Sequence, residues 1–240
     1  MIVLAFDSTA KTASCAVTDN DKCIASLNVD NGLTQSELLL PMAEDVLRTA
    51  KLTFNDIELL ACSVGPGSFT GVRIGAALVK GIAFGKNIPC AAVSTLEALA
   101  ANLDGIRGII VPVMDARRSQ VYTAIFDARE ASPLRITDDD ALSLDALAEL
   151  LKPYSDSGEN IYLVGDGYDV AARVLREKGI ALCSTPELLR YQNAASIAKT
   201  AYAQYVRGEA ISDRDIKPTY LRLPQAERER LEKQKTKIGE

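Results

Sequence analysis

The sequence predicts an α/β fold of two related lobes, each with three strands followed by alternating helices and strands. The first observation is a repeat: an apolar run ends in Asp7, a small polar turn follows, and a second apolar run ends in Asp19. The same arrangement recurs at Asp115 and Asp127, again 12 residues apart. The second observation is that helical periodicity then alternates with short apolar runs in both halves. A unit used twice implies a cleft between its copies, whereas the alternative is two ordinary hairpins with turn-forming aspartates.

The elements of the first lobe follow from this pattern. They are strands over 1–7, 12–18 and 22–29, a helix over 35–51, a strand over 57–64, a helix over 69–85, a strand over 89–93 and a helix over 95–103. Thr34 and Glu37 form a Thr-x-x-Glu capping box that fixes the start of the first helix. Gly105 and Gly108 mark a boundary, which divides the chain into lobes over 1–105 and 106–225.

The second lobe repeats the order. Its predicted elements are strands over 108–114, 120–127 and 133–136, a helix over 144–152, a strand over 160–164, a helix over 168–178, a strand over 180–183 and a helix over 194–207. Pro153 is expected to end the helix over 144–152. Residues 226–240 alternate charges and carry few apolar side chains, so we expect a charged, solvated tail.

The amino-acid composition excludes several classes of catalytic and metal site. The 240 residues include no histidine, which excludes Ser-His-Asp and Cys-His nucleophile systems and HExxH zinc sites. Five cysteines without CxxC spacing, no basic leader and no long apolar run favour the cytoplasm and no membrane contact. A net charge of −5 argues against unaided binding of a nucleic-acid backbone, so RNA is expected only through a complex whose other subunits supply cations.

The segment Gly65 to Gly75, GPGSFTGVRIG, follows a strand and opens a helix, where backbone N–H groups can hold an anion. It lacks the Walker and dinucleotide patterns. Gly71 and Gly75 are four residues apart, and each helical glycine costs about 1 kcal/mol relative to alanine. That cost indicates close contact with a neighbouring helix or with a partner subunit.

A strand–Asp–turn–strand unit in duplicate resembles the actin-like ATPase (ASKHA, RNase H-like) superfamily. At the glycine-rich segment the resemblance becomes specific, to the bacterial TsaB (YeaZ) family. Further matches, in order along nearly the whole chain, are Leu4-Ala5-Phe6-Asp7-Ser8-Thr9, Thr34-Gln35-Ser36-Glu37, Ser94-Thr95-Leu96-Glu97-Ala98-Leu99-Ala100, Met114-Asp115-Ala116-Arg117-Arg118 and Pro218-Thr219-Tyr220-Leu221-Arg222.

The resemblance implies a protein needed to make threonylcarbamoyladenosine at position 37 of tRNAs reading ANN codons. It implies a non-catalytic subunit that binds TsaD, the metal-carrying transferase, with the small ATPase TsaE joining them and tRNA reached only indirectly. Many members carry histidine where this chain has Gln35, and Gln35 is a poor metal ligand, so no metal site is expected.

The apolar arc of the helix over 35–51 is wider than one sheet contact requires, so this helix is either deeply buried or covers the sheet with one face and meets a partner protein with the other. The second interpretation assigns the partner surface to the helices over 35–51 and 69–85, which would also pair two copies into a homodimer when the chain is alone. The residues expected at that interface are Leu38, Leu39, Met42, Val46, Gly71, Val72, Arg73, Gly75, Ala76 and Val79.

The alternative from another class is an actin-fold ATPase or kinase with Asp7 and Asp115 holding Mg²⁺. Both turns lack the glycines that let phosphates approach the backbone, so we expect at most a vestigial nucleotide cleft. Its residues would be Asp7, Ser8, Asp115, Arg117, Gly165 and Gly167. The chain itself is expected to need no cofactor, which leaves ATP or ADP at a complex interface open. A peptidase is disfavoured by the missing histidine.

Overall fold

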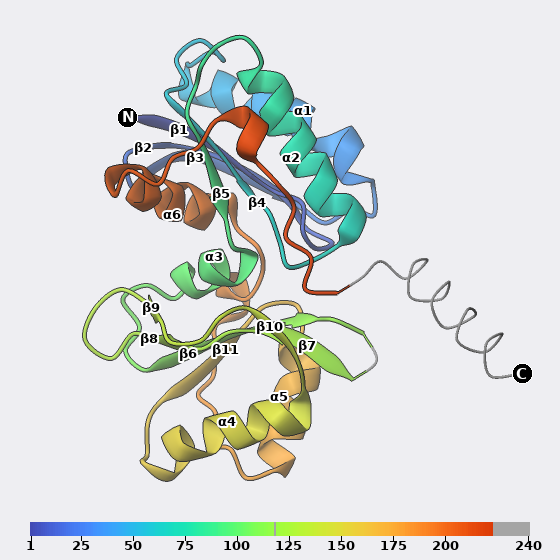
Figure 1. Cartoon of the computed structure of the whole chain (residues 1–240), viewed down its shortest axis with the longest axis vertical. Coiled ribbons are helices and arrows are strands. Elements are labelled where there is room, and N and C mark those ends of the chain that lie inside the picture. Colours follow the sequence, from blue (N-terminus) through green and yellow to red (C-terminus); the bar gives the residue numbers. More distant parts are fainter. Residues whose placement is uncertain (118, 223–240) are drawn as a thin grey trace, which may run out of the picture.

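The computed structural model describes residues 1–117 and 119–222, and the predicted tail over 226–240 lies outside them. Two sheet-containing lobes stack along the long axis of the molecule, with a short helix between them (Figure 1). The fold class predicted from the repeat is therefore confirmed. In the described residues no helix is long and apolar enough to span a membrane.

The first sheet has the strand order β3-β2-β1-β4-β5. Its strands are β1 (Ile2–Asp7), β2 (Ala13–Asp19), β3 (Lys22–Val29), β4 (Leu59–Ser63) and β5 (Cys90–Val93). The first three are antiparallel neighbours, while β4 and β5 run parallel to β1. Strands β1 and β4 are buried on both faces, as their continuous apolar sequences require.

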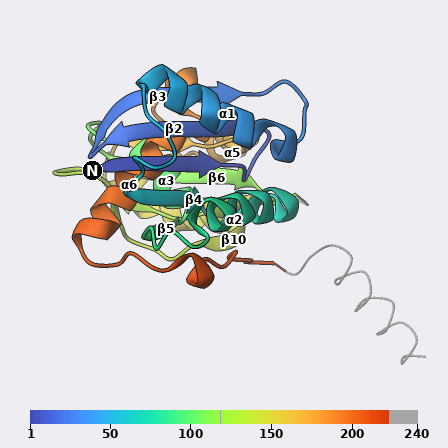
Figure 2. The same cartoon turned by 90° about the horizontal axis from the view of Figure 1, so that it is seen from above.

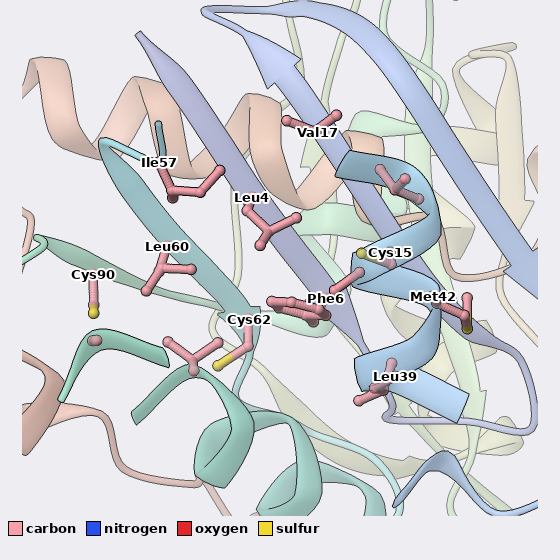
Figure 3. Packing of buried hydrophobic residues seen from close by; sticks show 14 of the residues in the cluster. Leu4, Phe6, Cys15, Val17, Leu39, Met42, Ile57, Leu60, Cys62 and Cys90 are labelled. Atoms are coloured by element: carbon pink, nitrogen blue, oxygen red, sulfur yellow. The ribbon is translucent and has the colours of Figure 1, made fainter. Parts of the chain in front are cut away.

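Helices α1 (Gln35–Ala50) and α2 (Phe69–Ala83) cover one face of this sheet (Figures 1 and 2). Leu39 and Met42 of α1 belong to the same buried cluster as Phe6 of the sheet, and Figure 3 shows the three side chains in this region. Thr34 and Glu37 make the predicted capping box at the start of α1.

The opposite face is covered by α6 (Ala194–Val206), whose Ile197 and Ala201 pack against Ala5 and Ala61. Our placement of this helix with the second lobe was wrong. The small side chains of β1 and β4 on that face let the alanine-rich α6 approach closely, which the local sequence does not reveal. The division at 105/106 itself stays a prediction.

The second sheet has the order β10-β7-β6-β8-β9, and β11 pairs with β6. Its strands are β6 (Ile109–Asp115), β7 (Gln120–Thr123), β8 (Phe126–Asp127), β9 (Leu134–Arg135), β10 (Asp140–Ser143) and β11 (Ile161–Val164). Helices α4 (Leu144–Asp156) and α5 (Tyr168–Glu177) pack against one face.

Four details of the second lobe differ from the prediction. The strand expected over 120–127 is two strands, because β7 and β8 pair with different parts of β6. Pro153 lies inside α4, where its ring removes a single backbone hydrogen bond and the helix continues to Asp156. The segment expected as a strand over 180–183 makes only a bridge between Cys183 and Tyr162, and β10 was not predicted.

Two segments connect the lobes. Helix α3 (Thr95–Ala101) packs Leu96 and Leu99 against Ile110 and Phe126 of the second sheet. The segment 211–222, which includes the 3₁₀ turn η2 (Asp213–Asp215), runs back along the first lobe. We call it the C-terminal strap. The Thr219 N–H donates to the Val64 carbonyl at 2.7 Å, and the Arg222 guanidinium donates to the Ala116 carbonyl at 2.6 Å.

Candidate functional site

A cleft of about 560 Å³ opens between the two lobes. The Asp7 turn, the start of α2, the turn after β6 and the C-terminal strap surround it. The residues that line it are Thr9, Ala10, Lys11, Gln35, Pro66, Gly67, Ser68, Phe69, Thr70, Met114, Asp115, Ala116, Arg117, Tyr122, Asp166, Thr219, Tyr220, Leu221 and Arg222. The predicted cleft therefore exists, and it contains Asp115 and Arg117 of the six residues assigned to it.

Asp7 lies behind the cleft wall and is buried. One carboxylate oxygen accepts hydrogen bonds from the Thr9 N–H and hydroxyl, both at 2.7 Å, and the other accepts one from Ser63 Oγ at 2.7 Å. Burial raises the pKa of the Asp7 carboxyl. Asp7 thus closes its own turn and presents no free carboxylate oxygen to the cleft.

The second copy of the repeat reproduces this turn. Asp115 Oδ1 accepts the Arg117 N–H at 2.7 Å, as Asp7 Oδ1 accepts the Thr9 N–H. Each aspartate bonds the backbone two residues on, which is the turn-closing role of the alternative that we weighed. The aspartates therefore close turns, as in that alternative, and they also belong to a duplicated two-lobed fold.

Two exposed carboxylates, Asp115 and Asp166, line the cleft. Asp166 faces Asp115, whose N–H donates to Asp166 Oδ1 at 3.3 Å, and desolvation raises the pKa of the Asp166 carboxyl. Gly165 and Gly167 do not line the cleft; they flank Asp166, and the Gly167 N–H donates to the Val113 carbonyl at 3.0 Å. In the part of the chain that the structure describes, no group of three or more His, Cys, Asp or Glu side chains could hold a metal ion.

Gly71 and Gly75 allow the Ser8 turn of the same chain to pack closely against α2. Ser8 Oγ donates to the Gly71 carbonyl at 2.8 Å. A Cβ atom on Gly71 would lie 1.8 Å from the Ser8 carbonyl oxygen, and one on Gly75 would lie 2.6 Å from Ser8 Oγ. Our assignment of these glycines to a partner interface was wrong, because the Ser8 turn occupies the space that they leave.

The other residues predicted at the partner interface divide in two. Only Leu38, half-buried, and Arg73, exposed, are accessible. The rest are buried, and all of them except Val72 belong to the core cluster of the first lobe, so their assignment to an exposed surface was wrong: Leu39, Met42, Val46, Val72, Ala76 and Val79. The sequence shows that both helices carry wide apolar arcs, but it does not show which part of each arc the sheet covers.

The accessible apolar surface of α2 is formed by residues next to the predicted ones in the sequence, on a neighbouring face of the helix. We call it the α2 stripe: Ile74, Ala77, Leu78, Gly81 and Ile82, at helical spacings of three and four. Ala77 and Gly81 are exposed and the other three are half-buried. A Cβ on Gly81 would meet nothing within 4 Å among the described residues, so no contact among them explains this glycine, unlike Gly71.

Sequence reasoning missed a second feature, at the mouth of the cleft. The Phe69 and Tyr220 rings lie 4.7 Å apart, and the Arg73 guanidinium stacks 3.7 Å from the Phe69 centroid. Arg73 Nε donates to the Tyr220 hydroxyl at 2.8 Å. Both segments stood out as motifs, but 147 residues separate Arg73 from Tyr220 and nothing local pairs them.

Gln35 has a structural role. Its side-chain amide donates to the Ala10 carbonyl at 2.8 Å, which holds the start of α1 against the Asp7 turn.

Two lobes with matching aspartate turns around a cleft define an actin-like (ASKHA) protein. The ROK hexokinase of Thermus thermophilus superposes with a TM-score of 0.50 at 14% identity, over 87% of this chain and 100% of that one. This likeness shows the fold alone.

Closer comparisons give the family. Residues 34–229 match the family described as "TsaD: tRNA N6-adenosine threonylcarbamoyltransferase". A Bacillus subtilis protein named "tRNA threonylcarbamoyladenosine biosynthesis protein TsaB" is 30% identical over 98% of this chain and 100% of its own length. A Pseudomonas aeruginosa structure described as similar to peptidase YEAZ has a TM-score of 0.78 at 25% identity, over 92% of this chain and 99% of that one. The chain is a member of the TsaB family, within the larger group that the TsaD description covers.

Proposed function

We propose that this chain is a non-catalytic subunit of the complex that makes threonylcarbamoyladenosine in tRNA, and that it binds and activates the TsaD transferase. The TsaB name of its relatives supports the pathway. The transferase description of the matching family supports a partner of related fold. TsaE is the third component of this proposal.

The observation that carries the proposal is the α2 stripe. Ala77 and Gly81 are exposed, while Ile74, Leu78 and Ile82 are half-buried and pack partly against the core of the first lobe. Gly81 leaves room for the backbone of another helix. Leu38, also half-buried, lies on α1, which packs beside α2. Two related lobes can pair through such helices, because ridges of one fit grooves of the other. The same surface would pair two copies of the isolated chain.

The interior of the cleft supports a non-catalytic role. All the hydrogen bonds of the Asp7 carboxylate go to Thr9 and Ser63, and Asp115 is engaged with the Arg117 backbone. A kinase of this fold would need these carboxylates for Mg²⁺ and water, so no specific observation favours that second function.

Capture of TsaD tests the proposal. Ala77→Glu places a charge on the exposed stripe without touching the core, and Val170→Glu places the same charge on exposed α5 of the other lobe as a matched control. We expect the wild-type chain and Val170→Glu to co-purify with TsaD from the same organism and to restore threonylcarbamoyladenosine in tRNA of a strain lacking this gene. Ala77→Glu should fail in both assays.

The proposal fails if the wild-type chain neither captures TsaD nor restores the modified nucleoside. If the wild type captures TsaD and Ala77→Glu is fully active as well, the proposed function is retained but the α2 stripe is not the interface.

A further inference from the structure

Arginines gather at the mouth of the cleft in a chain whose net charge is negative. Arg117 and Arg222 line the cleft, and Arg73 contacts Phe69 and Tyr220, which also line it. Within residues 1–117 and 119–222 none of these three makes an ion pair. Elsewhere among the described residues, Arg48, Arg129, Arg135, Arg190 and Arg207 are paired with carboxylates, whereas Arg107, Arg173, Arg176 and Arg214 are likewise without an ion pair, so what distinguishes the three arginines is their place at one cleft.

The hydrogen bonds of these arginines leave donors available. Arg222 uses one nitrogen on the Ala116 carbonyl, which holds the strap against the second lobe. Arg73 uses Nε on the Tyr220 hydroxyl. Arg117 has a left-handed backbone (φ 61°), a conformation that is uncommon outside glycine, and its side chain is exposed at the cleft. Guanidinium groups with unused N–H donors are suited to phosphate oxygens.

Aromatic rings adjoin these charges. Phe69 and Tyr220 form a tilted pair with an interplanar angle of 32°, and Tyr220 is 40% exposed. Tyr122 lines the same cleft from β7. Exposed rings beside arginines are the surfaces on which proteins stack unpaired RNA bases.

The cleft also carries carboxylates. Asp115 and Asp166, both exposed, line it beside the arginines, and Lys11 is the nearby cation that lowers the pKa of Asp166 against the effect of desolvation. Carboxylates repel phosphate but accept hydrogen bonds from the amino groups of bases. The cleft therefore offers arginines to phosphates and carboxylates to the amino groups of a base, and about 560 Å³ is within the range of small-molecule pockets.

We propose that the cleft mouth is a contact surface for single-stranded RNA, in which Arg73, Arg117 and Arg222 hold phosphates and the cleft receives an unstacked base. This rests on the proposed function, because a tRNA-modifying complex brings the chain beside an exposed RNA loop. The net charge of −5 does not oppose it, since at physiological salt charges act over about 8 Å. Our expectation that RNA is reached only through other subunits stays a prediction; this proposal differs from it because it considers where the charges lie as well as their total.

Fluorescence anisotropy of a labelled short single-stranded RNA, titrated with the full chain at several salt concentrations, tests this. The rim double variant Arg117→Gln with Arg222→Gln should bind at least about tenfold more weakly, and its slope of log affinity against log salt should fall by about 1.4, or 0.7 for each lost phosphate contact. The matched control, Arg48→Gln with Arg207→Gln, removes the same charge at arginines that do not line the cleft and should stay within about twofold of wild type.

Stacking gives an independent readout. Tyr220→Ala should bind about fivefold or more weakly because the stacked base is lost, whereas Tyr205→Ala, which removes an exposed ring on α6 that does not line the cleft, should bind like wild type. Thermal unfolding shows whether each variant folds. If loss of the Arg222 contact unfolds the strap, Arg117→Gln alone still carries the test, because its backbone hydrogen bond to Asp115 is retained.

The inference is overturned if the wild-type chain binds no RNA, if control and rim variants weaken equally, or if duplex RNA binds as well as single strands. It is also overturned if ATP displaces the RNA at micromolar concentration, which would indicate a free-nucleotide site. If the chain captures TsaD but binds no RNA, only the RNA-contact surface is rejected. If the chain binds RNA through these arginines but does not capture TsaD, the proposed function is rejected and the RNA-contact surface is retained.

Discussion

Replacing Gly71 by alanine tests whether the glycine-rich segment serves the chain's own cleft wall. The new Cβ would lie 1.8 Å from the Ser8 carbonyl oxygen, a backbone atom that cannot rotate away. Either α2 or the Ser8 turn must move, and overpacking of this kind costs about 1–3 kcal/mol, occasionally more. The gain of about 1 kcal/mol expected for alanine in a helix offsets part of it.

Gly81→Ala is the matched control on the same helix, because its Cβ would meet no described atom within 4 Å. We expect Gly71→Ala to lower the melting temperature by a few degrees and Gly81→Ala to raise it by about 2–4 °C, since 1 kcal/mol shifts a chain of this size by about that much. Calorimetry of the purified chain measures both. If Gly71→Ala melts at or above the wild-type temperature, the Ser8 contact does not explain the glycine.

Three further predictions concern the core, the buried carboxyl and self-association. Leu39→Ala should cost about 2–5 kcal/mol of unfolding free energy and Leu38→Ala much less, as urea unfolding would show; equal losses would contradict the burial pattern. The pKa of Asp7 is raised in the folded state, so ionisation of this carboxyl destabilises the fold as the pH rises. The stability of Asp7→Asn relative to wild type should therefore be greater at pH 7.5 than at pH 4 in thermal melts. A difference between the two proteins that does not change with pH would refute this. Ala77→Glu should weaken any homodimer in sedimentation equilibrium, and an unchanged association constant would exclude the α2 stripe from the dimer contact.

Sequence patterns predicted the first lobe well because its signals are local. The capping box at Thr34 is contained in four residues, and the Asp7 and Asp115 turns each close over two. Predictions were weaker in the second lobe. The break between β7 and β8 depends on which part of β6 each one pairs with, which is a tertiary relation.

The candidate site was predicted in part for the same reason. Asp115 and Arg117 were expected at the cleft because the repeat places them there, and both line it. The Phe69–Tyr220 pair and the Arg222 contact with Ala116 join residues more than 100 positions apart, so no spacing in the sequence indicates them.

By itself the sequence determined the duplicated strand–aspartate–turn unit, the order of most elements and the family, since strand alternation, caps and turns are encoded by neighbouring residues. Only the tertiary structure decided which face of α2 the sheet buries, that Gly71 makes room for Ser8, and that α6 and the strap return to the first lobe. A helix with a wide apolar arc satisfies its local pattern in several orientations, and the packing of the whole chain selects one of them.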